Sequence, residues 1–189
     1  MKVASEHGKR IVAVSDTSCT IYNENGLDIE EVLKYKREKG KLTGFSGGRE
    51  LPRDDILKLD VDILVPAAVE NVITEENWKE IKAKLILELA NGPTQITIDG
   101  KLKEKGIIVI PDVLANAGGV VVSYLEWVQN RTGDRWEEEE IRSKLKTIMT
   151  KAFEEVMTRS EENNIDLRRG SYLVAVDRII EAAKLRGEI

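Results

Sequence analysis

Cysteine, histidine and aromatic side chains are scarce in this chain of 189 residues, which has one cysteine, one histidine and 5% aromatic residues. The single cysteine, Cys19, cannot form an internal disulfide bond, so a reducing compartment such as the cytoplasm is expected. A nucleophilic thiol also needs a base nearby, and His7 is the lone histidine. The composition therefore does not favour thiol catalysis.

Long apolar runs and a one-sided charge are also missing. Apolar stretches are short and interrupted by charged residues, and residues 1–10 lack the apolar middle of a secretory signal, so no membrane association is expected. Charged residues make up 33% of the chain, with a net charge of −5 and both signs interleaved, so no basic stripe for nucleic acid is expected. Abundant lysine and glutamate with one cysteine is a pattern found in thermophilic proteins.

Residues 107–133 combine an apolar run, a pair of glycines and a helical pattern. The run IIVI at 107–110 predicts a buried strand, and NAGG at 116–119 predicts a tight turn with close backbone approach. The helical spacing that follows predicts a helix. In α/β proteins such a unit brings backbone N–H groups to a ligand at the carboxyl edge of a sheet. An ordinary strand-to-helix connection is the alternative.

The rest of the chain alternates between strand and helix signals. Asp28 and Gly40 bound one predicted helix, and Thr74 begins another. Residues 95–100 weaken a helix there because they include β-branched side chains and a glycine. The further predicted strands are residues 10–15, 42–45, 61–66 and 84–89, and the further predicted helices are residues 52–59, 136–163 and a last one from Asp166 or Leu167.

Asp16 closes the first of these strands. A carboxylate at such a strand end accepts two hydrogen bonds from the adenosine ribose diol in dinucleotide-binding folds. A cap of a turn or helix is the other interpretation, and it is the one that the position alone favours. The acidic run at 137–140 could hold a metal, but a solvated first helical turn is favoured, so no metal site is predicted.

The amino-acid sequences of four segments resemble those of one protein family. NAGGVVVSYLEWVQN at 116–130 resembles the NAGGVTVSYFEWVQN signature of the glutamate dehydrogenases, and 11–28, 61–74 and 88–94 match in the family's order. The resemblance implies reversible oxidative deamination of L-glutamate to 2-oxoglutarate and ammonia, with NAD or NADP as hydride acceptor, in a homohexamer. A leucine, phenylalanine or valine dehydrogenase is a lesser alternative. The segment at 11–28 departs from the family pattern at Cys19 and Thr20, where the family has glycines.

Site roles follow from the resemblance alone. It implies that Asn116 binds the nicotinamide carboxamide and that Ser123 donates to the γ-carboxylate of glutamate. The alternative for Ser123 is a helix hydroxyl bonded to its own backbone. The remaining positions line either the cofactor cleft, namely Asp16, Ala67, Ala68 and Asn91, or the glutamate pocket, namely Val120.

Two parts of such an enzyme are missing from the sequence. No strand with a G-x-G-x-x-G turn opens the chain, and no lysine or aspartate lies in the family's catalytic motifs, so no catalytic residue is assigned. The predicted fold is α/β: an incomplete, Rossmann-like doubly wound sheet without its first strand at 1–116, and a C-terminal helical segment at 117–189. The chain alone is expected to be inactive. A catalytically silent binding remnant of a truncated gene is the alternative function.

The missing strand would leave two half-sheets with free edges. We expect the strands at 10–15 and 61–66 not to pair with each other, because the strand between them in a doubly wound sheet is absent. A second chain could fill the slot, or the chain could be part of a longer protein. The choice between NAD and NADP stays open, because the 2′-phosphate pocket partly involves the missing turn.

Overall fold

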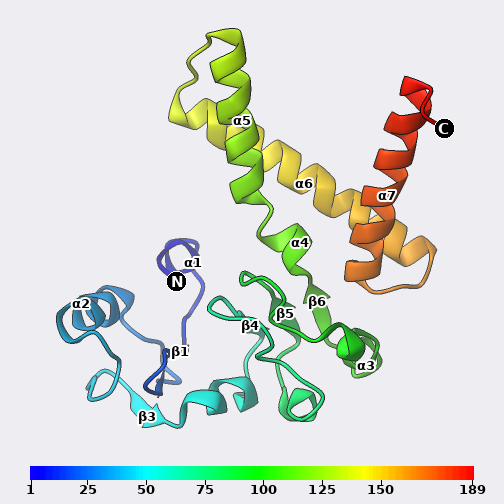
Figure 1. The fold of residues 1–189 in the computed structure, drawn as a ribbon. Coiled ribbons are helices and arrows are strands. Elements are labelled where there is room, and N and C mark those ends of the chain that lie inside the picture. The colour runs from blue at the N-terminus through cyan, green and yellow to red at the C-terminus, as the bar shows by residue number, and fades with distance from the viewer. The chain divides into compact units, whose positions relative to one another are not determined.

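A computed structural model describes residues 1–189 as a mixed α/β protein with a parallel sheet and C-terminal helices, which confirms the predicted fold class (Figure 1). Six strands form two separate three-stranded sheets. No ladder therefore joins β1 (Ala13–Ser15) to β4 (Ile63–Leu64), as predicted. The chain divides into two compact units, the first made of residues 1–60 and 80–82 and the second of residues 61–79 and 83–189.

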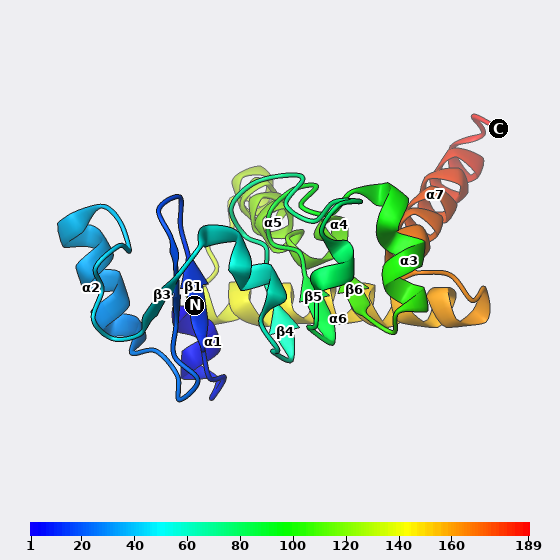
Figure 2. The same cartoon turned by 90° about the horizontal axis from the view of Figure 1, so that it is seen from below.

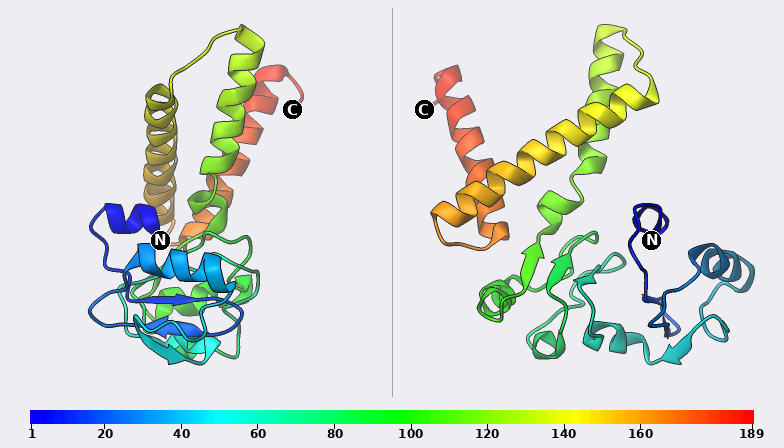
Figure 3. Two further views of the ribbon diagram at one scale, coloured as in Figure 1. Left: turned by 90° about the vertical axis from the view of Figure 1, so that its left-hand side faces the viewer. Right: turned by 180° about the vertical axis from the view of Figure 1, so that it is seen from behind.

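The first unit is an antiparallel sheet covered by one helix. β1 (Ala13–Ser15), β2 (Thr20–Tyr22) and β3 (Arg49–Leu51) pair in that order, and α2 (Ile29–Lys39) lies across them (Figure 3, left). The predicted helix boundaries are confirmed, because the Asp28 carboxylate accepts from the Glu31 amide and Gly40 ends the helix with a φ of 72°. The unit also contains α1 (Lys2–Glu6) and a short 3₁₀ helix (Arg53–Lys58).

The strand predicted at 42–45 is wrong, and the antiparallel order of this sheet was not foreseen. Leu42 and Phe45 are buried core residues on a turn, in which the Phe45 amide donates to the Leu42 carbonyl and Gly44 has a φ of 83°. The Asp16 amide likewise donates to the Cys19 carbonyl and closes a tight turn. That turn sends β2 back along β1, so the chain forms a hairpin instead of a parallel crossover.

The second unit contains the parallel sheet. β4 (Ile63–Leu64), β5 (Leu85–Leu87) and β6 (Ile108–Ile110) pair in that order, and Figure 2 shows them side by side. All three lie within the strands predicted from the sequence. A 3₁₀ turn (Ile96–Ile98) leads into α3 (Asp99–Glu104), so the expected weakening of a helix at 95–100 is confirmed.

Two local predictions in this unit are wrong. The segment after Thr74 forms turns and a single 3₁₀ turn (Trp78–Glu80), because the Asn77 side chain bonds the Thr74 amide and the Val72 carbonyl and so competes with helical bonds. Gly118 and Gly119 do not form a tight turn either. They begin α5 (Gly118–Thr132), and neither has a positive φ.

Four helices follow β6 and make up the C-terminal part of the chain. Short α4 (Asp112–Ala115) leads into α5. α6 (Glu138–Glu162) then turns back and crosses α5 obliquely, and α7 (Leu167–Arg186) starts at the far end of α6 (Figures 1 and 3). The predicted long helix and last helix are confirmed, with Asp166 as the cap of α7. None of the helices is both long enough and apolar enough to cross a membrane.

At Gly170, α6 and α7 approach each other so closely that there is no room for a side chain. A Cβ added there would overlap Ser160 Oγ and lie 3.3 Å from the Val156 carbonyl oxygen. We expect Gly170→Ala to lower the free energy of unfolding by about 1–3 kcal/mol, because overpacking outweighs the gain in helix propensity. Urea unfolding followed by circular dichroism measures this. Equal stability of Gly170→Ala and wild type would show that the helices separate without cost.

Gly100→Ala is the matched control for that substitution. Gly100 is also helical, lies in α3, and has no atom within 4 Å of the added Cβ. Its replacement should therefore raise the free energy of unfolding, by about 0.4–1 kcal/mol, through the lower entropy of the unfolded chain.

Candidate functional site

The carboxyl ends of β4, β5 and β6 meet at one edge of the parallel sheet, and four of the predicted site residues lie there. Ala67 and Ala68 follow β4, Asn91 follows β5, and Asn116 follows β6 and α4. The first two loops are tied together because the Leu89 and Ala90 amides both donate to the Pro66 carbonyl at 3.0 Å. We call these segments the carboxyl edge. This is the side of an α/β sheet on which ligands bind.

Asn91 and Asn116 are joined by a hydrogen bond across this edge. Asn116 Nδ2 donates to Asn91 Oδ1 at 2.7 Å, and weakly to the Leu89 carbonyl at 3.5 Å. The bond uses the nitrogen of Asn116 and the oxygen of Asn91. Asn116 Oδ1 therefore remains available as an acceptor, and Asn91 Nδ2 as a donor. The Asn91–Asn116 pair thus offers groups that a carboxamide and a hydroxyl can each match.

Ala67 and Ala68 give this edge its shape. Both are exposed, and neither carries a side chain beyond Cβ. A flat ring could therefore approach the backbone here without displacing a side chain.

Val120 and Ser123 lie on α5, directly after Asn116. Residues three or four positions apart share a helix face, so the two lie on one side of α5 at the end near Asn116. Both are exposed, Val120 by 74%. Since the Ser123 side chain has no hydrogen bond to the helix backbone, unlike Thr132 near the end of α5, its hydroxyl is free to donate.

Asp16 lies in the first unit, where its carboxylate is occupied by internal donors. Oδ1 accepts from the amides of Ser18 and Cys19 and from the Ser18 hydroxyl, and Oδ2 accepts from Lys36 and from the Leu42 amide at 3.0 Å. Burial raises the pKa of Asp16, but the hydrogen bonds from Lys36 and Ser18 outweigh it and hold that pKa well below its usual range. Asp16 therefore organises its own turn.

Sequence reasoning missed a buried charge cluster behind the carboxyl edge. Arg168, in the first turn of α7, is 6% exposed and pairs with Glu88 at 2.8 Å, Asp99 at 2.6 Å and Asp112 at 2.9 Å. Burial opposes its charge, but Asp99 and Glu88 raise the pKa of Arg168 above its usual value. The available signal was Glu88 in the apolar run LILELA at 85–90, directly after β5, since a buried glutamate is almost always paired.

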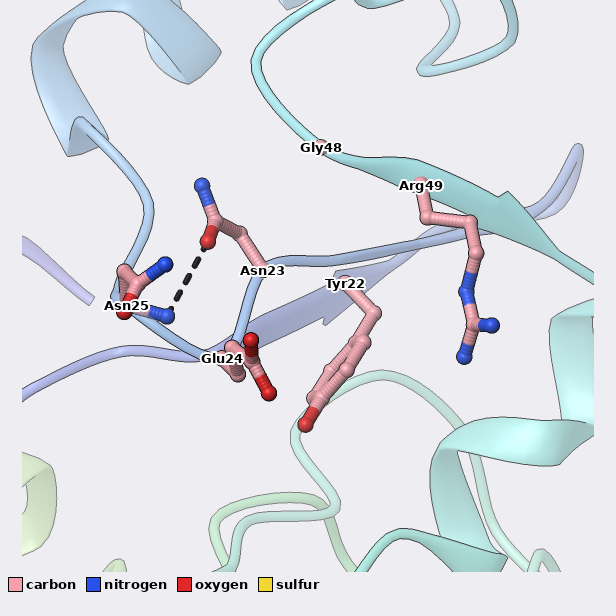
Figure 4. A pocket seen from close by; sticks show the side chains of 6 residues that line it. All are labelled: Tyr22, Asn23, Glu24, Asn25, Gly48 and Arg49. Atoms are coloured by element: carbon pink, nitrogen blue, oxygen red, sulfur yellow. Dashed lines mark hydrogen bonds between the residues drawn. The ribbon is translucent and has the colours of Figure 1, made fainter.

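A shallow hollow on the first unit holds none of the predicted site residues. It is lined by Tyr22, Asn23, Glu24, Asn25, Gly48 and Arg49, and Figure 4 shows the Asn25 amide donating to Asn23. The Arg49 guanidinium lies over the Tyr22 ring at 5.7 Å. The hollow is open and its charged groups do not converge, so it does not replace the carboxyl edge as the candidate site.

The fold is that of an α/β protein in which a parallel sheet, with a candidate ligand-binding edge, is followed by C-terminal helices. The model of the Glutamate/Leucine/Phenylalanine/Valine dehydrogenase family matches residues 1–187. A glutamate dehydrogenase of Thermotoga maritima is 45% identical over 185 residues, which cover 98% of this chain and 44% of that protein. The chain therefore belongs to this family of amino-acid dehydrogenases.

Solved structures agree with the assignment. The hetero-hexameric glutamate dehydrogenase of Thermus thermophilus in its leucine-bound form superposes with a TM-score of 0.89 at 32% identity, over 98% of this chain and 44% of that one. The glutamate dehydrogenase of Peptoniphilus asaccharolyticus gives 0.83 at 40% identity, over 100% and 44%. The chain thus spans less than half the length of the relatives it matches.

Proposed function

We propose that this chain is the cofactor-edge and helical portion of an NAD- or NADP-dependent glutamate dehydrogenase. The observation that carries the proposal is the Asn91–Asn116 pair at the carboxyl edge, beside two alanines, in a chain that belongs to this family. The bound nicotinamide would supply the hydride acceptor for the oxidative deamination of L-glutamate to 2-oxoglutarate and ammonia. The chain's own residues bind and orient.

The residues present fit the nicotinamide half of the cofactor. Asn116 Oδ1 can accept from the carboxamide NH₂, and Asn91 Nδ2 can donate to a ribose hydroxyl. Ala67 and Ala68 leave room for the ring. Asp16 fits the adenosine ribose less directly, because a diol would have to replace the Ser18 hydroxyl or Lys36 on its carboxylate.

The glutamate pocket would be built on α5. Val120 would contact the aliphatic part of the substrate, and the unpaired Ser123 hydroxyl would donate to the γ-carboxylate. Both lie one to two helical turns beyond Asn116, so substrate and nicotinamide would share the same end of α5. Holding two reactants in this way is a large part of the rate enhancement in a hydride transfer.

The rest of the enzyme would supply the phosphate-binding turn, the catalytic lysine and aspartate, and much of a hexamer contact. Residues 1–116 would then belong to the dinucleotide-binding domain, and residues 117–189 would link it to the substrate domain. Exposed apolar side chains on α5 and α7 support a covering partner of this kind, since such patches mark interaction sites. The most exposed of these side chains are Val120, Tyr124, Trp127, Tyr172, Ile179 and Leu185.

A chimera tests the proposal. The matching portion of the Thermotoga maritima enzyme would be replaced by this chain, and glutamate-dependent formation of NADH or NADPH would be measured. We expect an active oligomer, and Asn116→Ala in the chimera should reduce kcat/KM by at least tenfold. A correctly assembled chimera without activity would favour a catalytically silent remnant.

Ser123→Ala in the same chimera should raise KM for glutamate roughly ten- to a hundredfold and leave KM for the cofactor nearly unchanged. The reason is that a hydrogen bond to a charged group contributes about 1.5–3 kcal/mol. Steady-state kinetics with each substrate varied in turn measure the split. Ser143→Ala, at an exposed position of α6, is the matched control. Equal changes in both KM values would remove Ser123 from the glutamate pocket.

A further inference from the structure

We propose that Arg168 is a positioning residue that fixes the Asn91–Asn116 pair by holding Asp112. What the pair binds rests on the proposed function, but the positioning itself rests on contacts in the second unit alone. Arg168 lies 56 positions after Asp112, and its hydrogen bonds go to Glu88, Asp99 and Asp112, not to either asparagine. Its influence on the carboxyl edge therefore has to pass through the carboxylates around it.

Asp112 is the point where the two asparagine loops meet. Its Oδ2 accepts from the Gly92 amide at 2.7 Å, directly after Asn91, and its backbone carbonyl accepts from the Asn116 amide at 2.9 Å. One residue thus fixes the backbone on both sides of the pair. Gly92 has a φ of 54°, so the loop turns sharply at the residue that Asp112 holds.

Arg168 in turn fixes the Asp112 side chain. Nη1 donates to Asp112 Oδ1 at 2.9 Å, while Nη2 donates to both oxygens of Glu88 at 2.8 and 2.9 Å. Glu88 Oε2 also accepts from the Asp112 amide at 2.9 Å, so Asp112 is held at its backbone and its side chain.

The guanidinium is itself oriented from a third side. Arg168 Nε donates to Asp99 Oδ2 at 2.6 Å, and Asp99 and Glu88 are 5% and 0% exposed. The planar fork therefore has one orientation, with Nη1 directed at Asp112. A lysine at this position would keep the charge but could not reach three carboxylates in fixed directions.

A purely structural role for Arg168, as the anchor of α7, is the competing account. α7 has other contacts that do not involve the Arg168 side chain. Asp166 accepts from the Arg169 amide at 2.9 Å, and Leu167 and Val174 pack with Leu114 and Val156. If anchoring were the whole role, Arg168→Lys would loosen the start of α7 and leave the asparagine pair as it is.

Nuclear magnetic resonance on the purified chain separates the two accounts. We expect Arg168→Lys to speed hydrogen exchange of the Gly92 amide at least tenfold and to move the Asn116 side-chain amide signals to the values of a solvent-exposed asparagine. The Arg169 amide, which caps α7, should keep its exchange rate. Arg169→Lys, at an exposed neighbouring position, is the matched control and should leave the Gly92 and Asn116 signals unchanged.

Unchanged Gly92 exchange and unchanged Asn116 signals in folded Arg168→Lys would overturn the proposal. If that variant does not fold, Asp99→Ala takes its place, since it removes the carboxylate that orients the Arg168 guanidinium and leaves the Asp112–Gly92 hydrogen bond itself intact. The same loss of protection at Gly92 supports the proposal, and wild-type protection overturns it. Adding NAD to wild type is a separate arm, whose failure counts against the proposed function and not against the positioning.

Discussion

The purified 189-residue chain should show no glutamate-dependent reduction of NAD or NADP. Its sequence has no G-x-G-x-x-G turn and no assigned catalytic lysine or aspartate, and it spans 44% of its relative's length. General acid–base catalysis alone contributes about 10²–10⁴-fold, and positioning of both reactants contributes more. The assay follows absorbance at 340 nm with saturating glutamate, with a boiled sample as the control.

Calorimetric titration should likewise give no micromolar dissociation constant for either cofactor. The pyrophosphate of a dinucleotide normally rests on the helix N-terminus that follows the missing turn. Micromolar affinity would show that another part of this chain holds the phosphates, and turnover above the boiled control would show that it also supplies the proton transfer.

Arg168→Met should be the most destabilising single substitution tested, with a loss of about 3–5 kcal/mol in the free energy of unfolding. The methionine fills much of the volume but leaves Glu88, Asp99 and Asp112 facing one another without a cation. Urea unfolding of the purified chain measures the loss. Arg169→Met makes the same chemical change one position along, where the side chain is exposed, and should change stability by less than about 1 kcal/mol.

The loss should depend on pH. Burial already raises the pKa of Asp99, while Arg168 lowers it, so removing Arg168 raises that pKa further. A carboxyl whose folded pKa is raised contributes stability at low pH and loses it as the pH rises through that pKa. The deficit of Arg168→Met should therefore be small near pH 4 and grow toward pH 8. A deficit independent of pH would indicate lost packing instead of unpaired carboxylates.

Strands and long helices were predictable because their signals are local. The apolar runs that became β4, β5 and β6 are contiguous, and the apolar stripes of α6 and α7 repeat every three or four residues. The first sheet was not predictable, since its hairpin depends on how the Asp16 side chain bonds the amides of Ser18 and Cys19. The same competition from a side chain, that of Asn77, removed a helix that a Thr cap had indicated.

The site was predictable only in part, for a different reason. Asn91 and Asn116 were recognised by resemblance, and strand order then brings them to one edge. The Arg168 cluster joins residues 56 to 80 positions apart, and no period or spacing in the sequence connects α7 to Glu88 or Asp112. Such a contact becomes visible only when the helices are placed on the sheet.

The most direct test of the central claim is to locate a nicotinamide cofactor on the chain. Millimolar NAD would be titrated into protein labelled at alanine methyl and asparagine amide groups, where weak binding is still measurable. The account predicts saturable shifts at Ala67, Ala68, Asn91 and Asn116. No shifts at these four residues, or shifts confined to the hollow around Tyr22 and Arg49, would contradict it.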